Sequence, residues 1–364
     1  MFCRTPLILL AMTMLTISRT SETFGDVRDV SAQPVAPGIC ALTWEAQSDP
    51  GNVKIERRVG DREFQIVGTC AATEAQYIDR FDAKVDEAVA YRMTPLDAGG
   101  NVAGAPLEYI TANSANLLPS GSFDMPLGSV PQLTGLSVSA SAPWSTSIVE
   151  GGPRGQGSRC MQFSTSDPNA AATYIMSSRW FIVTPRTAYQ FTWWTTESAH
   201  GTSFADGQAY GMTRERQKSF YEKTASLYVW QATRQGEWVG SSSSPRLPRD
   251  IRYVYVVIRG QGKLHPQPVR VADISIIDRD IELLQTTNLD ELVSEARLAS
   301  EHHAGLGLSA QVQSLTETAE TKHTELQSPK LQDIDAFLLS RADLCDAIRE
   351  LHRLSVVFRL AEVQ

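Results

Sequence analysis

The centre of the chain reads VTPRTAYQFTWW from Val183 to Trp194. Apolar residues precede the Thr-Pro-Arg-Thr segment, whose proline and short polar side chains are typical of a turn. After the turn, Tyr189, Phe191 and Trp193 alternate with polar residues, so they would share one face of a strand and point into a core. Trp194 would then point to the opposite face, where it is either exposed or covered by a loop. The stretch therefore predicts a strand, a turn and a returning strand.

Further apolar runs on both sides of this stretch predict a β-sandwich over residues 116–280. They lie at 160–163, 180–183, 227–230, 253–258 and 271–277. Six of the seven tryptophans fall in this region, which carries a net positive charge. Its opening, NLLPSGSFD at 116–124, and its closing ADISI at 272–276 resemble the jelly-roll fold of galactose-binding-like domains and many carbohydrate-binding modules. The resemblance implies a jelly roll and makes carbohydrate a candidate ligand.

Residues 24–115 predict a separate and smaller β-sandwich. Short alternating apolar runs are separated by turn signals such as DPGN at 49–52 and DAGGN at 97–101. Seven short strands at this spacing favour a sandwich. The runs ALTW at 41–44, VKIERR at 53–58 and AYRM at 90–93 resemble a fibronectin type III domain. The resemblance implies that Trp44 is the core tryptophan and that the domain is a spacer or a protein-binding module.

From residue 281 to residue 364 the apolar residues follow a helical period. Asn288 stands three positions before Glu291, which is the spacing of a capping box. Ser328-Pro329 would end one helix and start another, because proline suits the first helical turn. The region is acidic and largely polar, so the fold class we expect is mainly β, two sandwiches with a solvated C-terminal α-helical hairpin or short coiled coil. The region could instead belong to a larger helical unit.

The N-terminus, residues 1–23, has the form of a signal peptide. One positive charge at Arg4 is followed by about a dozen nearly apolar residues, too few to span a bilayer. The mature chain would be secreted, extracellular or on the cell surface, or periplasmic, and no membrane span would remain after cleavage. It would keep Cys40, Cys70, Cys160 and Cys345, none in a Cys-x-x-Cys pair. A Cys40–Cys70 bridge and buried free thiols both fit this spacing.

Catalytic motifs are missing from the sequence. It contains no His-Glu-x-x-His and no Gly-x-Ser-x-Gly, and the glycine-rich segment at 151–157 lacks the Gly-Lys-Ser/Thr ending of a phosphate-binding loop. The formal net charge is −8, which disfavours a broad basic surface for nucleic acid. We therefore expect a protein that is not an enzyme and has no organic cofactor.

A structural calcium ion is implied by the jelly-roll resemblance. In those families an acidic residue that ends the opening motif and an Asp in the last strand often bind such an ion, and the matching positions are Asp124 and Asp273. Calcium prefers several oxygen ligands, carboxylates among them. The alternative is that Asp124 caps a turn and that Asp273 pairs with a nearby arginine.

The candidate ligand site combines aromatic and basic residues of the second sandwich. Trp194 breaks the core alternation, and Tyr210, Arg214 and Arg216 lie in an unusually long connection at 197–224. A sugar offers an apolar C–H face and a rim of hydroxyls, so its site needs an aromatic platform and polar groups. We expect carbohydrate binding through the jelly roll. The alternatives are a structural or adhesive surface protein that contacts other proteins through both sandwiches, and an accessory part of a polysaccharide-degrading enzyme.

Overall fold

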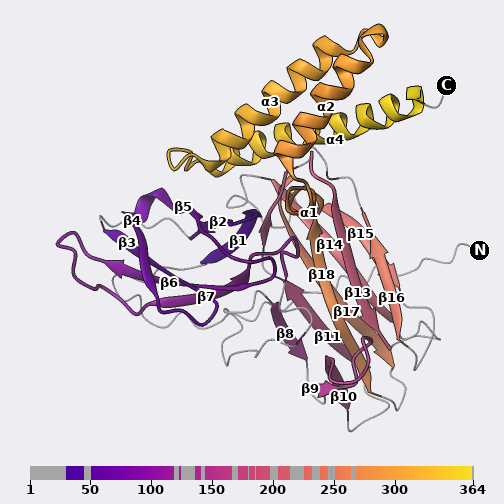
Figure 1. The fold of residues 1–364 in the computed structure, drawn as a ribbon. Coiled ribbons are helices and arrows are strands. Elements are labelled where there is room, and N and C mark those ends of the chain that lie inside the picture. Colours follow the sequence, from indigo (N-terminus) through magenta and orange to yellow (C-terminus); the bar gives the residue numbers. More distant parts are fainter. Residues whose placement is uncertain are drawn as a thin grey trace, which may run out of the picture.

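The structure is a computed structural model that shows a mainly β protein with helices at its C-terminal end (Figure 1). It describes residues 30–44, 51–118, 123, 136–140, 144–165, 171–178, 180–184, 186–196, 204–213, 225–231, 238–244, 247, 251–263 and 268–362. The predicted signal peptide, residues 1–23, lies outside the described residues. The fold class confirms the expectation of antiparallel sandwiches followed by helices.

The first sandwich pairs a three-stranded sheet, in the order β1-β2-β5, with a four-stranded sheet, in the order β4-β3-β6-β7. Trp44 lies in the core between them, as predicted, and its indole N–H donates to the carbonyl of Ala72 at 3.0 Å. Val53 and Ile55 alternate with polar residues along one strand, which is why one face of that strand is buried. The strands are β1 (Ser31–Ala36), β2 (Ile39–Thr43), β3 (Asn52–Val59), β4 (Gln65–Ala71), β5 (Gln76–Arg80), β6 (Ala88–Leu96) and β7 (Leu107–Ala112).

The second sandwich packs a five-stranded sheet, ordered β16-β13-β18-β10-β9, against a six-stranded sheet. The latter runs β15-β14-β17-β11-β8, with β12 paired to β17. All the pairings are antiparallel. Its strands are β8 (Leu136–Ala140), β9 (Trp144–Glu150), β10 (Arg159–Thr165), β11 (Ala171–Ser178), β12 (Phe181–Ile182), β13 (Tyr189–Thr195), β14 (Phe204–Thr213), β15 (Ala225–Gln231), β16 (Val239–Ser243), β17 (Ile251–Lys263) and β18 (Val269–Asp278).

The helices are α1 (Arg279–Thr286), α2 (Leu289–His302), α3 (Ser309–Gln327) and α4 (Ile334–Glu362). Asn288 caps α2 as predicted: its side-chain oxygen accepts from the backbone N–H of Glu291 at 3.4 Å. Asp278 caps α1, where its carboxylate accepts from the backbone N–H groups of Asp280 and Ile281. Of the described helices, none is long and apolar enough to cross a membrane.

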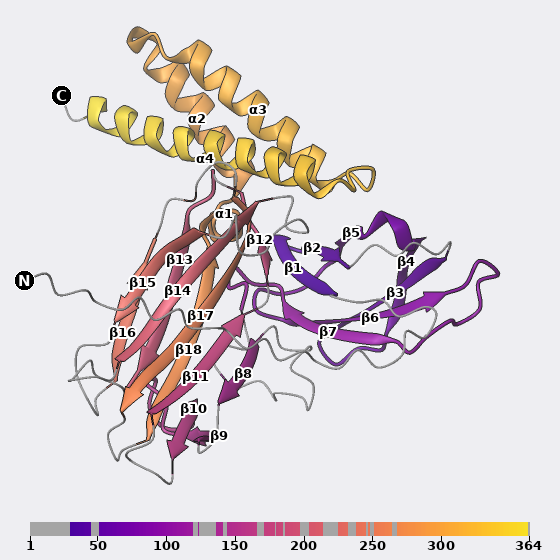
Figure 2. The ribbon, with the colours of Figure 1, turned by 180° about the vertical axis from the view of Figure 1, so that it is seen from behind.

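The helices are not a solvated tail, which differs from the expectation. Figures 1 and 2 show them gathered at one end of both sandwiches. A single cluster of buried apolar residues joins Val35 and Ile78 of the first sandwich, Ile182 of the second, and Phe337 and Leu351 of α4. The apolar stripe of α4 is therefore covered by strands as well as by other helices, and the acidic composition of the region concealed this.

The cysteines of the described chain, Cys40, Cys70, Cys160 and Cys345, are all free. Of the two readings of the Cys40–Cys70 spacing, the structure favours free thiols. Burial raises the pKa of the Cys70 thiol to about 12, and it raises the pKa of Cys40 and Cys345 further. Thiols with such pKa values are protonated at neutral pH and are poor nucleophiles.

Candidate functional site

The outer face of the five-stranded sheet carries an exposed tryptophan. Along β13, Tyr189, Phe191, Trp193 and Thr195 are buried, whereas Trp194 is 38% exposed. This is the alternation that the sequence predicted, with the first three side chains in the core of the second sandwich. Trp194 therefore stands on the sheet surface that faces away from that core.

Two very small residues flank Trp194 on the neighbouring strands. Its cross-strand partners are Gly240 in β16 and Ala272 in β18. A Cβ atom placed on Gly240 would lie 2.9 Å from both Cε2 and Cζ2 of the indole. The ring of Trp194 thus lies directly against the backbone of β16, in space that any larger residue would occupy.

A β-bulge in β18 lies beside this tryptophan. Thr192 pairs with Ser275 and Trp194 pairs with Ala272, so β18 has one extra residue between these two pairs. Asp273 is in this interval and has a left-handed backbone with φ of 49°. The bulge shifts the alternation, so that both Val271 before it and Ile274 after it point into the core.

Polar side chains surround the tryptophan on the same face. The hydroxyl groups of Thr192 and Ser275 are hydrogen bonded to each other. Arg270 donates through Nε to Oε1 of Gln162 at 3.1 Å. The loop that joins β9 to β10 also reaches this face, because the carbonyl of Gly151 accepts from the Trp238 indole N–H at 3.2 Å.

The structure does not gather all the predicted ligand-binding residues. Tyr210 lies on β14, in the six-stranded sheet, whereas Trp194 lies on the outer face of the five-stranded one. These two residues are therefore in different layers and do not form one platform. Arg214 and Arg216 lie outside the described residues. The connection predicted at 197–224 contains β14, so it is partly a strand and not only a loop.

Asp273, one of the two predicted calcium ligands, forms an ion pair with an arginine side chain. Oδ1 of Asp273 lies 2.9 Å from Nη2 of Arg154. Within the described ranges, no group of three or more His, Cys, Asp or Glu could hold a metal ion. A carboxylate balanced by a guanidinium does not fit a calcium site on its own, and Asp124 lies outside the described residues. Calcium binding stays a prediction.

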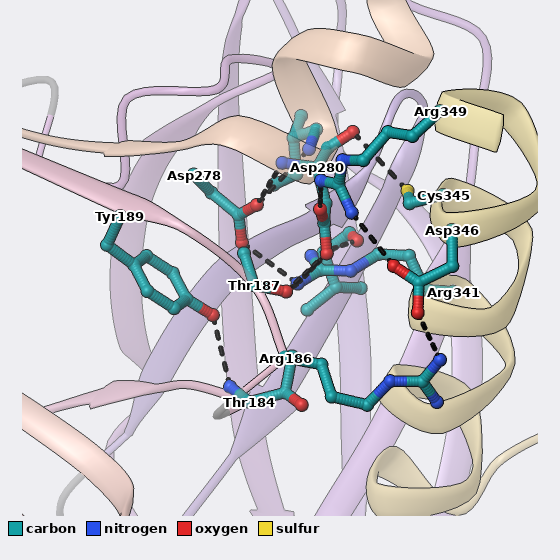
Figure 3. A network of polar contacts seen from close by, with 12 residues as sticks. Thr184, Arg186, Thr187, Tyr189, Asp278, Asp280, Arg341, Cys345, Asp346 and Arg349 are labelled. Atoms are coloured by element: carbon teal, nitrogen blue, oxygen red, sulfur yellow. Dashed lines mark hydrogen bonds and ion pairs between the residues drawn. The ribbon is translucent and has the colours of Figure 1, made fainter. Parts of the chain in front are cut away.

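A buried polar network lies where the helices meet the two sandwiches (Figure 3). Arg341 of α4 is fully buried, and its Nη2 lies 3.0 Å from Oδ2 of Asp278. Its Nη1 donates to the carbonyl of Val35 at 2.7 Å. Asp280, also buried, is bonded to Thr187 and to Arg349. Burial raises the pKa of Asp278, and the charge of Arg341 opposes that effect.

This network is structural. The carboxylates of Asp278 and Asp280 and the Arg341 guanidinium are at most 1% exposed, so they are closed to a ligand in solution. The sequence did not single out these residues, because charged groups in an acidic helical region are normally solvated. The exposed face around Trp194 is the better candidate for a ligand site.

Comparison with known proteins finds only distant likenesses in structure. No protein-family model matches the chain, and no curated protein matches it. Solved structures show a distant likeness, among them the enzymatically active domain of tailspike protein 4 of bacteriophage CBA120, with 9% identity and a TM-score of 0.34. That match covers 45% of this chain and 21% of the tailspike domain, so the chain spans about a fifth of its length.

Carbohydrate-binding modules are also among the similar structures. The module TmCBM61, solved with β-1,4-galactotriose, has 13% identity and a TM-score of 0.31, with 45% of this chain and 98% of that chain covered. A module of the β-sandwich superfamily has 11% identity and a TM-score of 0.30, over 71% of this chain and all of that chain. This chain is thus distantly similar in fold to carbohydrate-binding β-sandwiches.

Proposed function

We propose that this protein is an exported, non-catalytic protein that binds carbohydrate on the outer face of the five-stranded sheet. The observation that carries the proposal is Trp194, a large aromatic ring that is partly exposed on a sheet surface and packs against Gly240. An aromatic face held in this way offers a platform for the apolar C–H face of a sugar.

The groups around the ring supply the polar part of such a site. Thr192 and Ser275 present hydroxyl groups, and Gln162 presents an amide, on the face that holds Trp194. Sugar hydroxyls need donors and acceptors in fixed positions, and side chains on strands are held more firmly than side chains on loops. The first sandwich, which resembles a fibronectin type III domain in sequence, would act as a spacer.

The test compares stability with retention on polysaccharides. Trp194→Ala is expected to lose at least about tenfold in retention on the preferred polysaccharide, a change of about 1.4 kcal/mol. Its melting temperature should stay close to that of the unchanged protein, because a partly exposed ring contributes less to stability than a buried one. Trp194→Phe should keep part of the retention. Affinity electrophoresis across a panel of plant, algal and bacterial polysaccharides measures the first quantity, and thermal unfolding measures the second.

The matched control is Leu339→Ala, which removes an exposed apolar side chain from α4, where no ligand site is proposed. It should leave retention unchanged. Retention that survives Trp194→Ala would remove the proposed site. A strongly destabilised Trp194→Ala protein would show that this tryptophan is a covered core residue.

A further inference from the structure

Arg270 is a charged residue of β18 on the same sheet face as the exposed tryptophan. Trp194 pairs with Ala272 of β18, and Arg270 stands two residues along that strand, opposite Thr196. Residues two apart on a strand share a face, and such diagonal cross-strand neighbours lie about 7–8 Å apart. Arg270 and Trp194 therefore belong to the same surface.

The side chain of Arg270 is held in position by neutral groups. Its Nε donates to Oε1 of Gln162 at 3.1 Å, and its backbone N–H donates to Oγ1 of Thr196 at 2.9 Å. A Cβ atom on Gly151 would lie 3.5 Å from its Nη1, so the end of the guanidinium reaches the loop between β9 and β10. The backbone bond fixes Arg270 in register beside Thr196, and the Nε bond to Gln162 holds the guanidinium on the sheet face.

No described carboxylate forms an ion pair with Arg270. The nearest acidic residue along β18, Asp273, is paired with Arg154 instead. Half-buried arginines usually lie beside an opposite charge, because partial desolvation of a cation is unfavourable without one. Arg270 is thus a positioned cation with a neutral partner, on the same sheet face as an exposed aromatic ring.

We propose that the ligand is an acidic glycan, in which a uronate carboxylate or a sulfate ester binds Arg270 while a sugar ring stacks on Trp194. The inference rests on the proposed carbohydrate-binding function and specifies its substrate class. A guanidinium presents parallel N–H donors that match the two oxygens of a carboxylate or a sulfate, and such charge-assisted bonds are stronger than neutral ones. The net positive charge of residues 116–280 favours the same class of ligand.

The experiment uses acidic and neutral polysaccharides in matched pairs. Polygalacturonate is compared with its fully methyl-esterified form, and dextran sulfate is compared with dextran, by affinity electrophoresis of the full chain. The unchanged protein should bind at least one acidic member about tenfold more tightly than its neutral counterpart. The pair that shows the difference identifies the anion as a carboxylate or a sulfate.

Substitutions then test the role of Arg270. Arg270→Gln should remove most of the preference for the acidic polysaccharide of the pair. Arg270→Lys should remove part of it, since an ammonium keeps the positive charge but lacks the parallel N–H donors of a guanidinium. Arg353→Gln is the control, because this exposed arginine on α4 gives the same change in net charge. It should leave binding unchanged.

Three results would overturn the inference. Equal binding to acidic and neutral members, with an intact effect of Trp194→Ala, would leave carbohydrate binding standing and remove the acidic class. An equal loss from Arg270→Gln and Arg353→Gln would indicate non-specific charge attraction. Retention of none of the polysaccharides, here or on the wider panel, would end both proposals. Thermal unfolding of each variant separates loss of binding from loss of folding. If Arg270→Gln does not fold, the binding of Arg270→Lys tests whether Arg270 determines the preference for acidic polysaccharides.

Discussion

Gly240 determines where the ring of Trp194 lies. The indole occupies the space above this glycine, and a Cβ atom there would be 2.9 Å from two of its ring carbons. Because the ring is at the surface, it can move outward to make room. This strand glycine therefore sets how close the exposed aromatic ring lies to the sheet.

Gly240→Ala is expected to displace this ring without unfolding the protein. The free energy of unfolding should change by less than about 1 kcal/mol, because alanine suits a strand better than glycine and offsets the crowding. Retention on the preferred polysaccharide should fall several-fold, and the near-ultraviolet circular dichroism of the tryptophans should change. Gly305→Ala is the control, since a Cβ there meets nothing within 4 Å. Identical behaviour of the two variants would contradict this account of the ring.

The bulge in β18 is the local feature that shapes the face around Trp194. It places Asp273 in the left-handed region, with φ of 49°, where its carboxylate meets Arg154. Asparagine and aspartate tolerate this backbone conformation, whereas β-branched residues do not. The identity of residue 273 should therefore matter more for the backbone than for the ion pair.

Asp273→Asn and Asp273→Val separate these two contributions. Asp273→Asn should cost about 0.2–1 kcal/mol, because it removes an ion pair to a half-exposed arginine. Asp273→Val removes the same pair and adds about 1–2 kcal/mol of left-handed strain. Denaturant unfolding measures both. Equal costs would show that the backbone at residue 273 relaxes, and a larger cost for Asp273→Asn would assign the carboxylate a further partner.

The strands that the sequence predicted are those with strong alternation. In β13 the order of apolar and polar residues is enough to separate the buried Trp193 from the exposed Trp194. The sequence of β14, FADGQAYGMT, is rich in small and polar residues, so it predicts part of a long connection. Backbone hydrogen bonds to β15 on one side and to β17 on the other hold this strand in the sheet. Such hydrogen bonds do not depend on the side chains, so the amino-acid sequence alone does not predict them.

The site was predictable only in part for the same reason. The alternation of apolar and polar residues along β13 is enough to predict that Trp194 points away from the core. Gly240, Ala272 and Arg270 belong to the site only through the register of β16 and β18 against β13, and the bulge in β18 breaks the simple count of that register. Only the fold brings Arg270 onto the sheet face that holds Trp194, and the residues beside Arg270 in the sequence do not predict this.

β12 shows how an apolar strand can be buried on both faces. Phe181 lies in the core of the second sandwich, while Ile182 lies in the cluster shared with the helices and the first sandwich. The amide group of Gln33, on β1, bonds to both the N–H and the carbonyl of Ile182 at 2.7 Å. The sequence does not show that another domain and the helices cover the second face of this strand.

The two sandwiches and the helices are joined by specific polar contacts as well as by apolar packing. Gln332 bonds to the backbone of Ile78 in β5, and Arg80 donates to the carbonyls of Leu326 and Leu331. Arg341 links α4 to both sandwiches, through the carbonyl of Val35 and the carboxylate of Asp278. The surface that holds Trp194 is thus part of a larger packed unit.

Arg341→Ala is expected to destabilise the protein by about 3–5 kcal/mol, because it leaves two buried carboxylates, Asp278 and Asp280, without this cation. Arg341→Met fills the space and should cost nearly as much, since it also leaves the charges unbalanced. Arg353→Ala, at the exposed side of the same helix, should cost less than about 1 kcal/mol. Denaturant unfolding measures all three variants. A small cost for Arg341→Met would show that the cavity, and not the charge, accounts for the effect.

Removal of residues 281–364 tests whether the three parts depend on one another. The sequence alone predicts independent sandwiches after such a truncation, whereas the structure predicts the opposite. Without the helices, Val35, Ile78 and Ile182 lose the apolar side chains that cover them, and Asp278 and Asp280 lose Arg341. Newly exposed apolar area costs about 25 cal/mol per Å², and the uncovered residues come from both sandwiches.

The truncated chain should therefore unfold at a clearly lower temperature, in a broader or split transition followed by calorimetry. A single sharp transition at the temperature of the full chain would contradict this prediction. It would show that the helices are a separate domain, as the acidic composition of residues 281–364 predicts.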